Sequence, residues 1–187
     1  MSIILASESP RRRELLSRMG LDYIVRTAPH DETMNPFAAP SDEVARVSLL
    51  KAQAVYPNCR DEDIIVAADT IVVCDGLMMG KPRSEAEAFS MLRRLSGRDH
   101  QVMTGLTVMQ GSFAETVTVT TGIRFRHLAD DEIRAYIATG EPMDKAGAYG
   151  IQGLGGAYIT RIEGDYYATV GLSLCGLRKI LALAGLK

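Results

Sequence analysis

Apolar and polar positions along the chain change period several times, and each period predicts a different element. Threonine and valine alternate within Glu115–Arg126, which is the spacing of a half-buried strand. In Ser41–Tyr56 the apolar residues instead recur at roughly helical spacing. A third segment, Ile64–Cys74, is almost continuously apolar and β-branched, which is typical of a central strand.

The predicted strands cover Ser2–Ala6, Asp22–Thr27, Ile64–Cys74, Gln101–Gln110, Glu115–Arg126, Ala157–Ile162 and Tyr166–Val170. The first predicted helix begins at Pro10, is capped by Ser9 and ends at about Met19. Another begins at a capping box formed by Ser84 and Glu87 and ends at Gly97. The other predicted helices cover Ser41–Tyr56, Asp130–Thr139 and Leu172–Ala184. Hairpin turns are predicted at Asp75–Gly76 and Glu163–Asp165. Because helices and hairpins are interspersed, we expect an α/β fold with a mixed sheet.

Composition narrows the class of protein. The 187 residues suit one domain or two tightly joined lobes. A formal net charge of -2 argues against nucleic acid as a partner, and no apolar run reaches the roughly 18 residues that a membrane span needs. The N-terminal charges follow the apolar stretch, unlike those of a signal peptide, so we expect a cytoplasmic protein. Three cysteines without metal-motif spacing indicate reduced structural thiols.

The segment LASESPRRRELL predicts an anion site. A strand ends, a serine-rich turn follows, and a helix begins, so free backbone N–H groups and the positive end of the helix dipole face the turn. Ser7 and Ser9 add hydroxyl donors, and Arg11 and Arg12 add guanidinium groups that can bind phosphate oxygens in pairs. A solvated basic face with an ordinary serine cap is an equal alternative for this segment alone.

Asp69 interrupts the apolar strand Ile64–Cys74 in the sequence AADT. A buried carboxylate must be paired, bound to a metal or used in chemistry, and aspartate is depleted in strand interiors. We therefore favour a functional Asp69 over a structural one. Asp31 and Glu32 lie in a proline-containing loop and, with Asp69, offer the oxygen ligands that Mg²⁺ and Mn²⁺ prefer, although a solvated acidic pair is the simpler interpretation of the loop alone.

Two further segments add positive charge beside glycine. GKP places Lys81 in a stiff turn, and DKAGAYGIQG carries Lys145 and Gln152 among several glycines that permit close backbone approach or positive φ. An amide such as Gln152 has both the donor and the acceptor needed to bind the edge of a base. Lys51 in the second helix and Lys81 would each pass for an exposed lysine if considered alone.

Together these segments resemble the Maf family of nucleoside triphosphate pyrophosphatases. The resemblance runs in collinear order through LASESPRR, HDET, LLKAQAV, AADTIVV, GKP, GRDHQVMTG, FRHLADDEIRAYIATGEPMDKAGAYGIQG and GDYYATVGL, almost the whole chain. It implies a single Maf-like domain over residues 1–187, similar to inosine triphosphate pyrophosphatases, with an elongated mixed sheet, flanking helices and two lobes around a central cleft. It also implies a divalent cation, Mg²⁺ or Mn²⁺, a nucleoside triphosphate substrate cleaved to monophosphate and pyrophosphate, and a homodimer.

The same resemblance assigns roles to individual residues. The catalytic aspartate falls on Asp69, and the acidic loop residue falls on Glu32. The phosphate-site residues fall on Ser7, Arg11, Arg12, Lys51 and Lys81. The subfamily acting on dTTP and UTP has an arginine, a threonine and a glutamine at its specificity positions, matched here by Arg11, Thr70 and Gln152, whereas the sister subfamily acting on 7-methyl-GTP differs at this set. His30, Ala168 and Ser173 depart from the family pattern.

From these residues we expect metal-assisted attack of water on the α-phosphorus, with Asp69 as general base. The residues alone do not separate a base from a metal-ligand role for Asp69. A non-catalytic nucleotide-binding regulator of cell division or septum formation is the alternative. A pure binder needs cations but no base, so the presence of Asp69 and Glu32 favours the enzyme.

Overall fold

The structure, a computed structural model, describes residues 1–185 and divides into two compact units. Within the described residues, unit 1 consists of Met1–Asp69, Thr104–Val119 and residues 171–185, and unit 2 consists of Thr70–Met103 and Thr120–Val170. Three long strands contribute residues to both units: β3 (Ile64–Cys74), β5 (Asp99–Gln110) and β6 (Phe113–Phe125). Asp69 and Thr70, neighbours in β3, therefore belong to different units.

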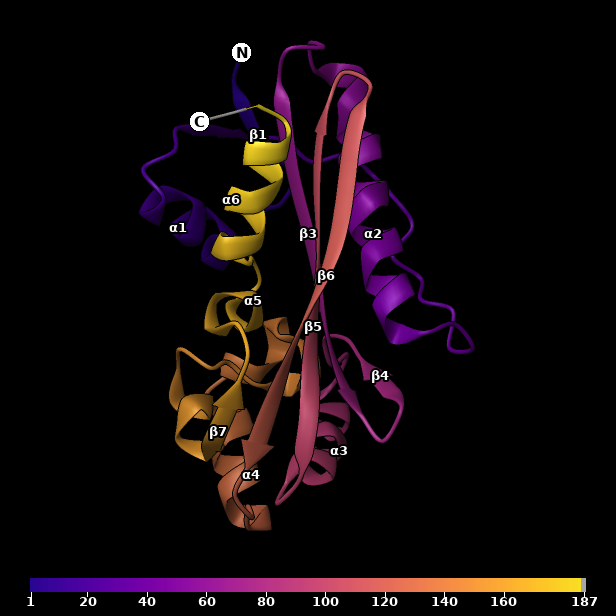
Figure 1. The fold of residues 1–187 in the computed structure, drawn as a ribbon. Coiled ribbons are helices and arrows are strands. Elements are labelled where there is room, and N and C mark those ends of the chain that lie inside the picture. Colours follow the sequence, from indigo (N-terminus) through magenta and orange to yellow (C-terminus); the bar gives the residue numbers. More distant parts are fainter. Residues whose placement is uncertain (186–187) are drawn as a thin grey trace. The chain divides into compact units, whose positions relative to one another are not determined.

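Unit 1 contains the N-terminal elements and the C-terminal helix. These are β1 (Ile3–Leu5), α1 (Pro10–Arg18), β2 (Tyr23–Val25), α2 (Pro40–Val55), a short 3₁₀ turn (Tyr56–Asn58) and α6 (Leu174–Leu183). Unit 2 contains β4 (Leu77–Met79), α3 (Glu85–Leu95), α4 (Asp130–Ala138), 3₁₀ turns at Glu141–Asp144, Ala146–Ala148 and Leu154–Tyr158, β7 (Ile159–Glu163) and α5 (Tyr166–Val170). Figure 1 labels the helices and strands.

The strands described in residues 1–185 pair in one mixed sheet of order β2-β1-β3-β5-β6-β7, with β4 paired to β3. β1 runs parallel to both β2 and β3, whereas β4 is antiparallel to β3 and β7 is antiparallel to β6. The predicted α/β fold with a mixed sheet and flanking helices is confirmed. The predicted cleft between two lobes and the single-domain assignment stay predictions.

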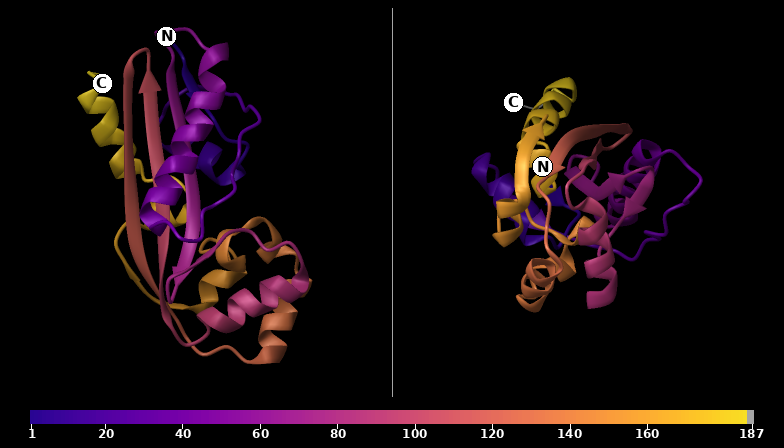
Figure 2. Two further views of the ribbon diagram at one scale, coloured as in Figure 1. Left: turned by 90° about the vertical axis from the view of Figure 1, so that its right-hand side faces the viewer. Right: turned by 90° about the horizontal axis from the view of Figure 1, so that it is seen from below.

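In unit 1, helices cover both faces of the strands. Successive side chains of a strand point to opposite faces. Thr107 of β5 hydrogen-bonds Ser48 of α2, whereas the neighbouring Leu106 lies against Gly176 of α6. The two helices accordingly lie on opposite sides of the strands (Figures 1 and 2). A Cβ on Gly105 would lie 2.3 Å from the carbonyl oxygen of Val44, so glycine is what lets the backbone of α2 approach β5 so closely.

In unit 2, an apolar core forms under α3 and α4. Leu92, Phe125, Leu128 and Ile133 are fully or almost fully buried in it. The predicted capping box of α3 is confirmed in one half, because Glu87 N donates to Ser84 Oγ at 3.2 Å. The Glu87 carboxylate, however, accepts from the N–H of Arg83 at 2.7 Å rather than from Ser84.

Two expectations about local structure are corrected. Tyr166–Val170, predicted as a strand, forms α5, so the turn at Glu163–Asp165 joins β7 to a helix and the hairpin predicted there is wrong. Asp165 accounts for the difference, because its Oδ1 accepts from Ala168 N at 3.1 Å and caps the first helical turn. Ser9 does occupy the N-cap position of α1, yet its hydroxyl makes no capping hydrogen bond within the described chain.

The three cysteines are free thiols, of which Cys74 is buried, Cys59 half-buried and Cys175 exposed. Among residues 1–185, none of the helices combines the length and the apolar character that crossing a bilayer requires.

Candidate functional site

Asp69 lies in the middle of the apolar strand β3, where the sequence predicted a buried carboxylate. It is 9% exposed. One oxygen, Oδ1, accepts a hydrogen bond from Lys51 Nζ at 2.7 Å. The other, Oδ2, is buried and has no hydrogen-bond partner among residues 1–185. Because a buried carboxylate oxygen is costly to leave unpaired, Oδ2 is the natural acceptor for a water, a metal ion or a substrate group.

Lys51 joins Asp69 to the second predicted acidic residue. Its Nζ lies 2.7 Å from Asp69 Oδ1 and 2.8 Å from Glu32 Oε1. The ammonium group thereby offsets the repulsion between two neighbouring carboxylates. Burial raises the pKa of Glu32, but the hydrogen bonds from Lys51 and His30 outweigh it and lower that pKa to about 2. Glu32 is therefore an anion at neutral pH.

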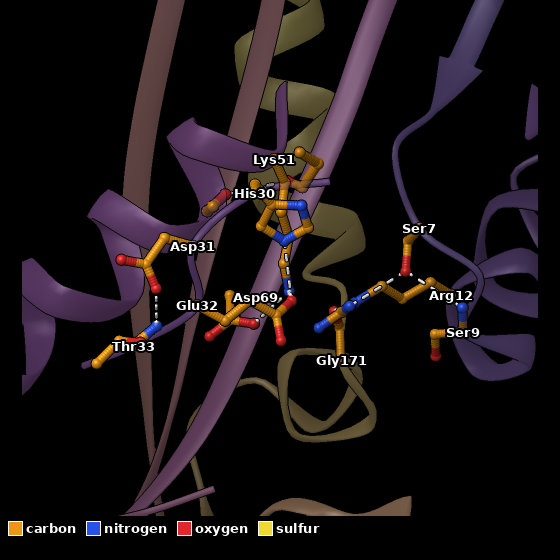
Figure 3. A network of polar contacts seen from close by, with 12 residues as sticks. Ser7, Ser9, Arg12, His30, Asp31, Glu32, Thr33, Lys51, Asp69 and Gly171 are labelled. Atoms are coloured by element: carbon orange, nitrogen blue, oxygen red, sulfur yellow. Dashed lines mark hydrogen bonds and ion pairs between the residues drawn. The ribbon is translucent and has the colours of Figure 1, made fainter. Parts of the chain in front are cut away.

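His30 is a member of this cluster that the sequence analysis did not assign. Its Nδ1 lies 2.8 Å from the carbonyl oxygen of Ala28, and its Nε2 lies 2.9 Å from Glu32 Oε1 (Figure 3). Asp31, by contrast, turns away from the cluster, and its Oδ1 accepts from the N–H of Thr33 at 2.8 Å. Within the HDET segment, Glu32 is thus the carboxylate that faces Lys51.

Hydrogen bonds of Ser48 set the position of Lys51 relative to β3. It lies one helical turn before Lys51 in α2, and its hydroxyl bonds the carbonyl oxygen of Ala67 at 3.2 Å and Thr107 Oγ1 at 2.8 Å. Ala67 precedes Asp69 by two residues and so shares its face of β3. The helix is therefore in register with the strand, Ser48 above Ala67 and Lys51 above Asp69. A lone serine in an apolar helix face was the available signal for this contact.

The serine-arginine segment folds as a turn before α1, also in unit 1. Arg12 donates from Nε to the carbonyl oxygen of Gly171 at 2.8 Å and from a terminal nitrogen to Ser7 Oγ at 3.2 Å (Figure 3). Burial lowers the pKa of Arg12, while the nearby carboxylates of Asp69 and Glu32 act in the opposite direction. Arg12 thus lies within electrostatic reach of the acidic pair. Arg11, the preceding residue of α1, is partly buried.

The remaining predicted residues, Thr70, Lys81, Lys145 and Gln152, belong to unit 2. Lys81 and Gln152 are exposed. The N–H of Gly147 donates to the carbonyl oxygen of Gly80 at 3.0 Å, so the GKP turn and the glycine-rich segment are in direct contact. Lys145 Nζ donates to the carbonyl oxygen of Glu141 and to Asp144 Oδ1, both at 2.6 Å.

The donor set suits a hard divalent cation of the kind that the resemblance implies. Residues 1–185 contain no group of three or more histidine, cysteine, aspartate or glutamate side chains able to hold a metal by themselves. Mg²⁺ is usually bound by one or two carboxylates together with substrate phosphates and water. Asp69, with its unpaired Oδ2, and the anionic Glu32 fit that arrangement.

The chain is similar to known proteins in sequence and, more weakly, in structure. The family described as "Maf-like protein" matches residues 2–184. A protein of Moorella thermoacetica named "dTTP/UTP pyrophosphatase" is 48% identical over 185 residues, covering 98% of this chain and 95% of its own. One of Symbiobacterium thermophilum with the same name is 49% identical over 175 residues, covering 92% and 88%. Among solved structures, the Staphylococcus aureus Ham1 protein matches at 16% identity and a TM-score of 0.46, over 70% of this chain and 73% of its own.

A family match across nearly all residues and relatives at almost half identity agree with the motifs quoted from the sequence. The chain belongs to the Maf family.

Proposed function

We propose that this protein hydrolyses nucleoside triphosphates between the α- and β-phosphates, with dTTP and UTP as preferred substrates. It is an enzyme, as its family relatives named dTTP/UTP pyrophosphatase indicate. The observation that carries the proposal is the Glu32–Lys51–Asp69 cluster, in which one carboxylate oxygen of a buried aspartate is held by a lysine and the other is left without a partner among residues 1–185.

In the proposed reaction, Asp69 Oδ2 accepts a proton from a water molecule. The water oxygen forms a bond to the α-phosphorus while the bond from that phosphorus to the bridging oxygen of the β-phosphate breaks, and pyrophosphate leaves. Lys51 holds Asp69 through Oδ1, so Oδ2 stays directed away from the ammonium group. Orientation of this kind is what makes a general base effective.

Positive charge supplies the second requirement, because negative charge builds on the phosphate oxygens. Arg11, Arg12 and Lys81 are proposed to bind those oxygens, with Ser7 supporting Arg12 through its hydroxyl. Glu32 would hold the divalent cation, which when bound adds Lewis-acid charge at the phosphates, and Asp69 Oδ2 would be its second ligand in the alternative in which Asp69 is not the base. Lys51 contributes by neutralising the acidic pair rather than as a freely moving phosphate ligand.

Base choice is assigned to Arg11, Thr70 and Gln152. The exposed amide of Gln152 can bond the adjacent carbonyl and N–H of thymine or uracil. A base with another donor pattern leaves those groups unpaired, at a cost of about 1–3 kcal/mol. Lys145 donates hydrogen bonds to Glu141 and Asp144. Its first role in the proposal is therefore to hold the conformation of this segment, and binding of phosphate is secondary.

The test is a panel of dTTP, UTP, CTP, GTP, ATP and 7-methyl-GTP with Mg²⁺ or Mn²⁺, in which pyrophosphate and orthophosphate are detected separately. We expect pyrophosphate, with dTTP and UTP highest in kcat/KM. Orthophosphate as the first product would contradict the bond assignment. Saturable nucleotide binding without any turnover would instead favour the non-catalytic regulator.

A further inference from the structure

The glycine-rich segment of unit 2 is anchored by one carboxylate that the sequence analysis did not single out. Glu141 Oε1 accepts from the hydroxyl of Tyr136 at 2.8 Å and from the N–H of Gly155 at 3.3 Å. Its Oε2 accepts from the N–H of Leu154 at 2.9 Å. A single side chain therefore binds two consecutive backbone amides that follow Gln152 and Gly153.

The same anchor also reaches the beginning of the segment. The hydroxyl of Tyr136, which donates to Glu141, accepts from the N–H of Gly150 at 3.1 Å. Glu141 thus fixes Leu154 and Gly155 directly and Gly150 through Tyr136. Gln152 lies between these fixed points, two residues from either one.

The glycines of this segment have a packing explanation. A Cβ on Gly153 would lie 2.4 Å from Glu141 Oε1, and one on Gly155 would lie 2.6 Å from the hydroxyl oxygen of Tyr136. These contacts are far too short for a real Cβ, so the two glycines make room for the anchor. The sequence predicts ligand approach or positive φ at these glycines, but neither has a positive φ, and the space beside each one is filled by a side chain of the protein itself.

The charge of Glu141 is stabilised by the contacts it makes. Burial raises its pKa, but hydrogen bonds from Leu154, Tyr136 and Gly155 outweigh burial and lower the pKa from its ordinary value. At neutral pH both oxygens therefore act as acceptors. Lys145 Nζ additionally holds the backbone of Glu141 by donating to its carbonyl oxygen.

We propose that Glu141 is a positioning residue for base selection, holding Gly150–Gly155 in the conformation that presents the Gln152 amide to the base. This inference rests on the proposed function of Gln152. A glutamine amide discriminates between bases only if its donor and acceptor are held in a fixed orientation, because a freely rotating amide satisfies several donor patterns. The anchor supplies that constraint without touching the substrate.

The variant that tests the role is Glu141→Gln. It keeps the size of the side chain but replaces one acceptor oxygen with an NH₂ group, which cannot accept from Leu154 or Gly155. Glu132→Gln is the matched control, since Glu132 is a carboxylate of the same unit, 32% exposed, whose partner is Arg126. Tyr136→Phe removes the bridge to Gly150 with little change in volume, and it serves if Glu141→Gln does not fold.

We expect Glu141→Gln to lower the ratio of kcat/KM for dTTP over GTP by about 10-fold or more, mainly through a higher KM for dTTP, with kcat changed by less than about 3-fold. Tyr136→Phe should shift the ratio in the same direction, and Glu132→Gln should leave it unchanged. Hydrogen exchange at the amide that then faces the NH₂ group, Leu154 or Gly155, should become faster in Glu141→Gln and stay unchanged in Glu132→Gln.

The outcomes separate this inference from the proposed function. A wild type that prefers dTTP, with an unchanged ratio and unchanged exchange in Glu141→Gln, overturns the inference and leaves the proposed function standing. A wild type without pyrimidine preference overturns the proposed substrate and with it the role of Glu141 in base selection. If Glu141→Gln lowers kcat for dTTP and for GTP but leaves the ratio of their kcat/KM values unchanged, that result also contradicts a positioning role in base selection.

Discussion

Lys51 and Asp69 form a largely buried ion pair, with Nζ 2.7 Å from Oδ1 and only 11% and 12% of the two side chains exposed. The pair leaves Asp69 Oδ2 as a buried acceptor without a partner among residues 1–185. Oδ1 thus stabilises the fold through the ion pair, whereas Oδ2 can accept a proton or bind a ligand.

Asp69→Asn should lower kcat by at least about 10²-fold, the usual contribution of a general base. The amide is nearly isosteric with the carboxylate and still accepts from Lys51 through its oxygen, so the variant should fold. Steady-state kinetics with saturating Mg²⁺ and circular dichroism check the two statements. Asp75→Asn is the control, because Asp75 is a turn carboxylate bonded to Arg98. A folded Asp69→Asn with near-normal turnover would rule out Asp69 as the base.

Lys51→Met should destabilise the protein by about 3 kcal/mol, because it leaves a buried carboxylate without its cation. Combining it with Asp69→Asn should restore part of that loss, since the double variant buries neither charge. The free energies of urea unfolding of the two single variants and the double variant form a thermodynamic cycle. We expect a coupling of at least about 1 kcal/mol between the two positions. Strictly additive changes would mean that the pair contributes nothing to stability.

Lys81→Ala should reduce turnover more than Lys179→Ala. Both lysines are exposed, so neither substitution should disturb packing. Lys81 lies in the turn assigned to phosphate, whereas Lys179 lies on α6 outside the quoted motifs. The measurement is kcat/KM for dTTP in both variants at one ionic strength. Equal kinetics would remove Lys81 from the phosphate site.

Gly105→Ala should lower the free energy of unfolding by about 1–3 kcal/mol or more, as overpacking does. Its Cβ would lie 2.3 Å from a backbone oxygen of α2, which cannot move without shifting the whole helix. Gly122→Ala is the control within a strand, since its Cβ would meet its nearest atom at 3.7 Å. Urea unfolding of both variants tests the difference, and equal effects would contradict the close approach of α2.

The sequence predicted those parts of the fold whose signals are local. The apolar run of β3, the Ser84 cap of α3 and the position of Asp69 all follow from residue type and spacing. The strand predicted at Tyr166–Val170 failed because aromatic and β-branched residues suggested a strand, while the cap from Asp165 decided for a helix.

What the sequence could not predict are contacts between residues distant in the chain. Nothing near Glu141 in the sequence shows that its partners are the amides of Leu154 and Gly155, and nothing near Gly105 identifies Val44. Lys51 passed for a solvated lysine because its partners lie 18 and 19 residues away. Such pairs become visible only once the sheet sets which segments are neighbours.

His100 is 4% exposed in the core of unit 2. Its Nε2 lies 2.8 Å from the hydroxyl of Tyr149, and its ring packs edge-on against Phe125. Burial lowers the pKa of His100 from 6.5 to about 4, and the nearby Asp99 opposes this shift without reversing it. The folded protein therefore keeps His100 neutral where the unfolded chain would take up a proton.

The sign follows from that difference. Above pH 6.5 both states leave the ring neutral, and the contribution of His100 to stability is fully present. As the pH falls from about 6.5 to about 4, the unfolded chain binds the proton first, so about 3 kcal/mol of stability is lost over this interval.

His100→Gln lacks this pH-dependent contribution, so the stability difference between wild type and variant should shrink as the pH falls. The other titratable groups affect the free energy of unfolding equally in both proteins, so their contributions cancel in the difference. Urea unfolding at several pH values between 7.5 and 4.5 measures the difference, with the exposed His127→Gln as control. Parallel stability curves for wild type and His100→Gln would show that His100 is not held neutral by burial.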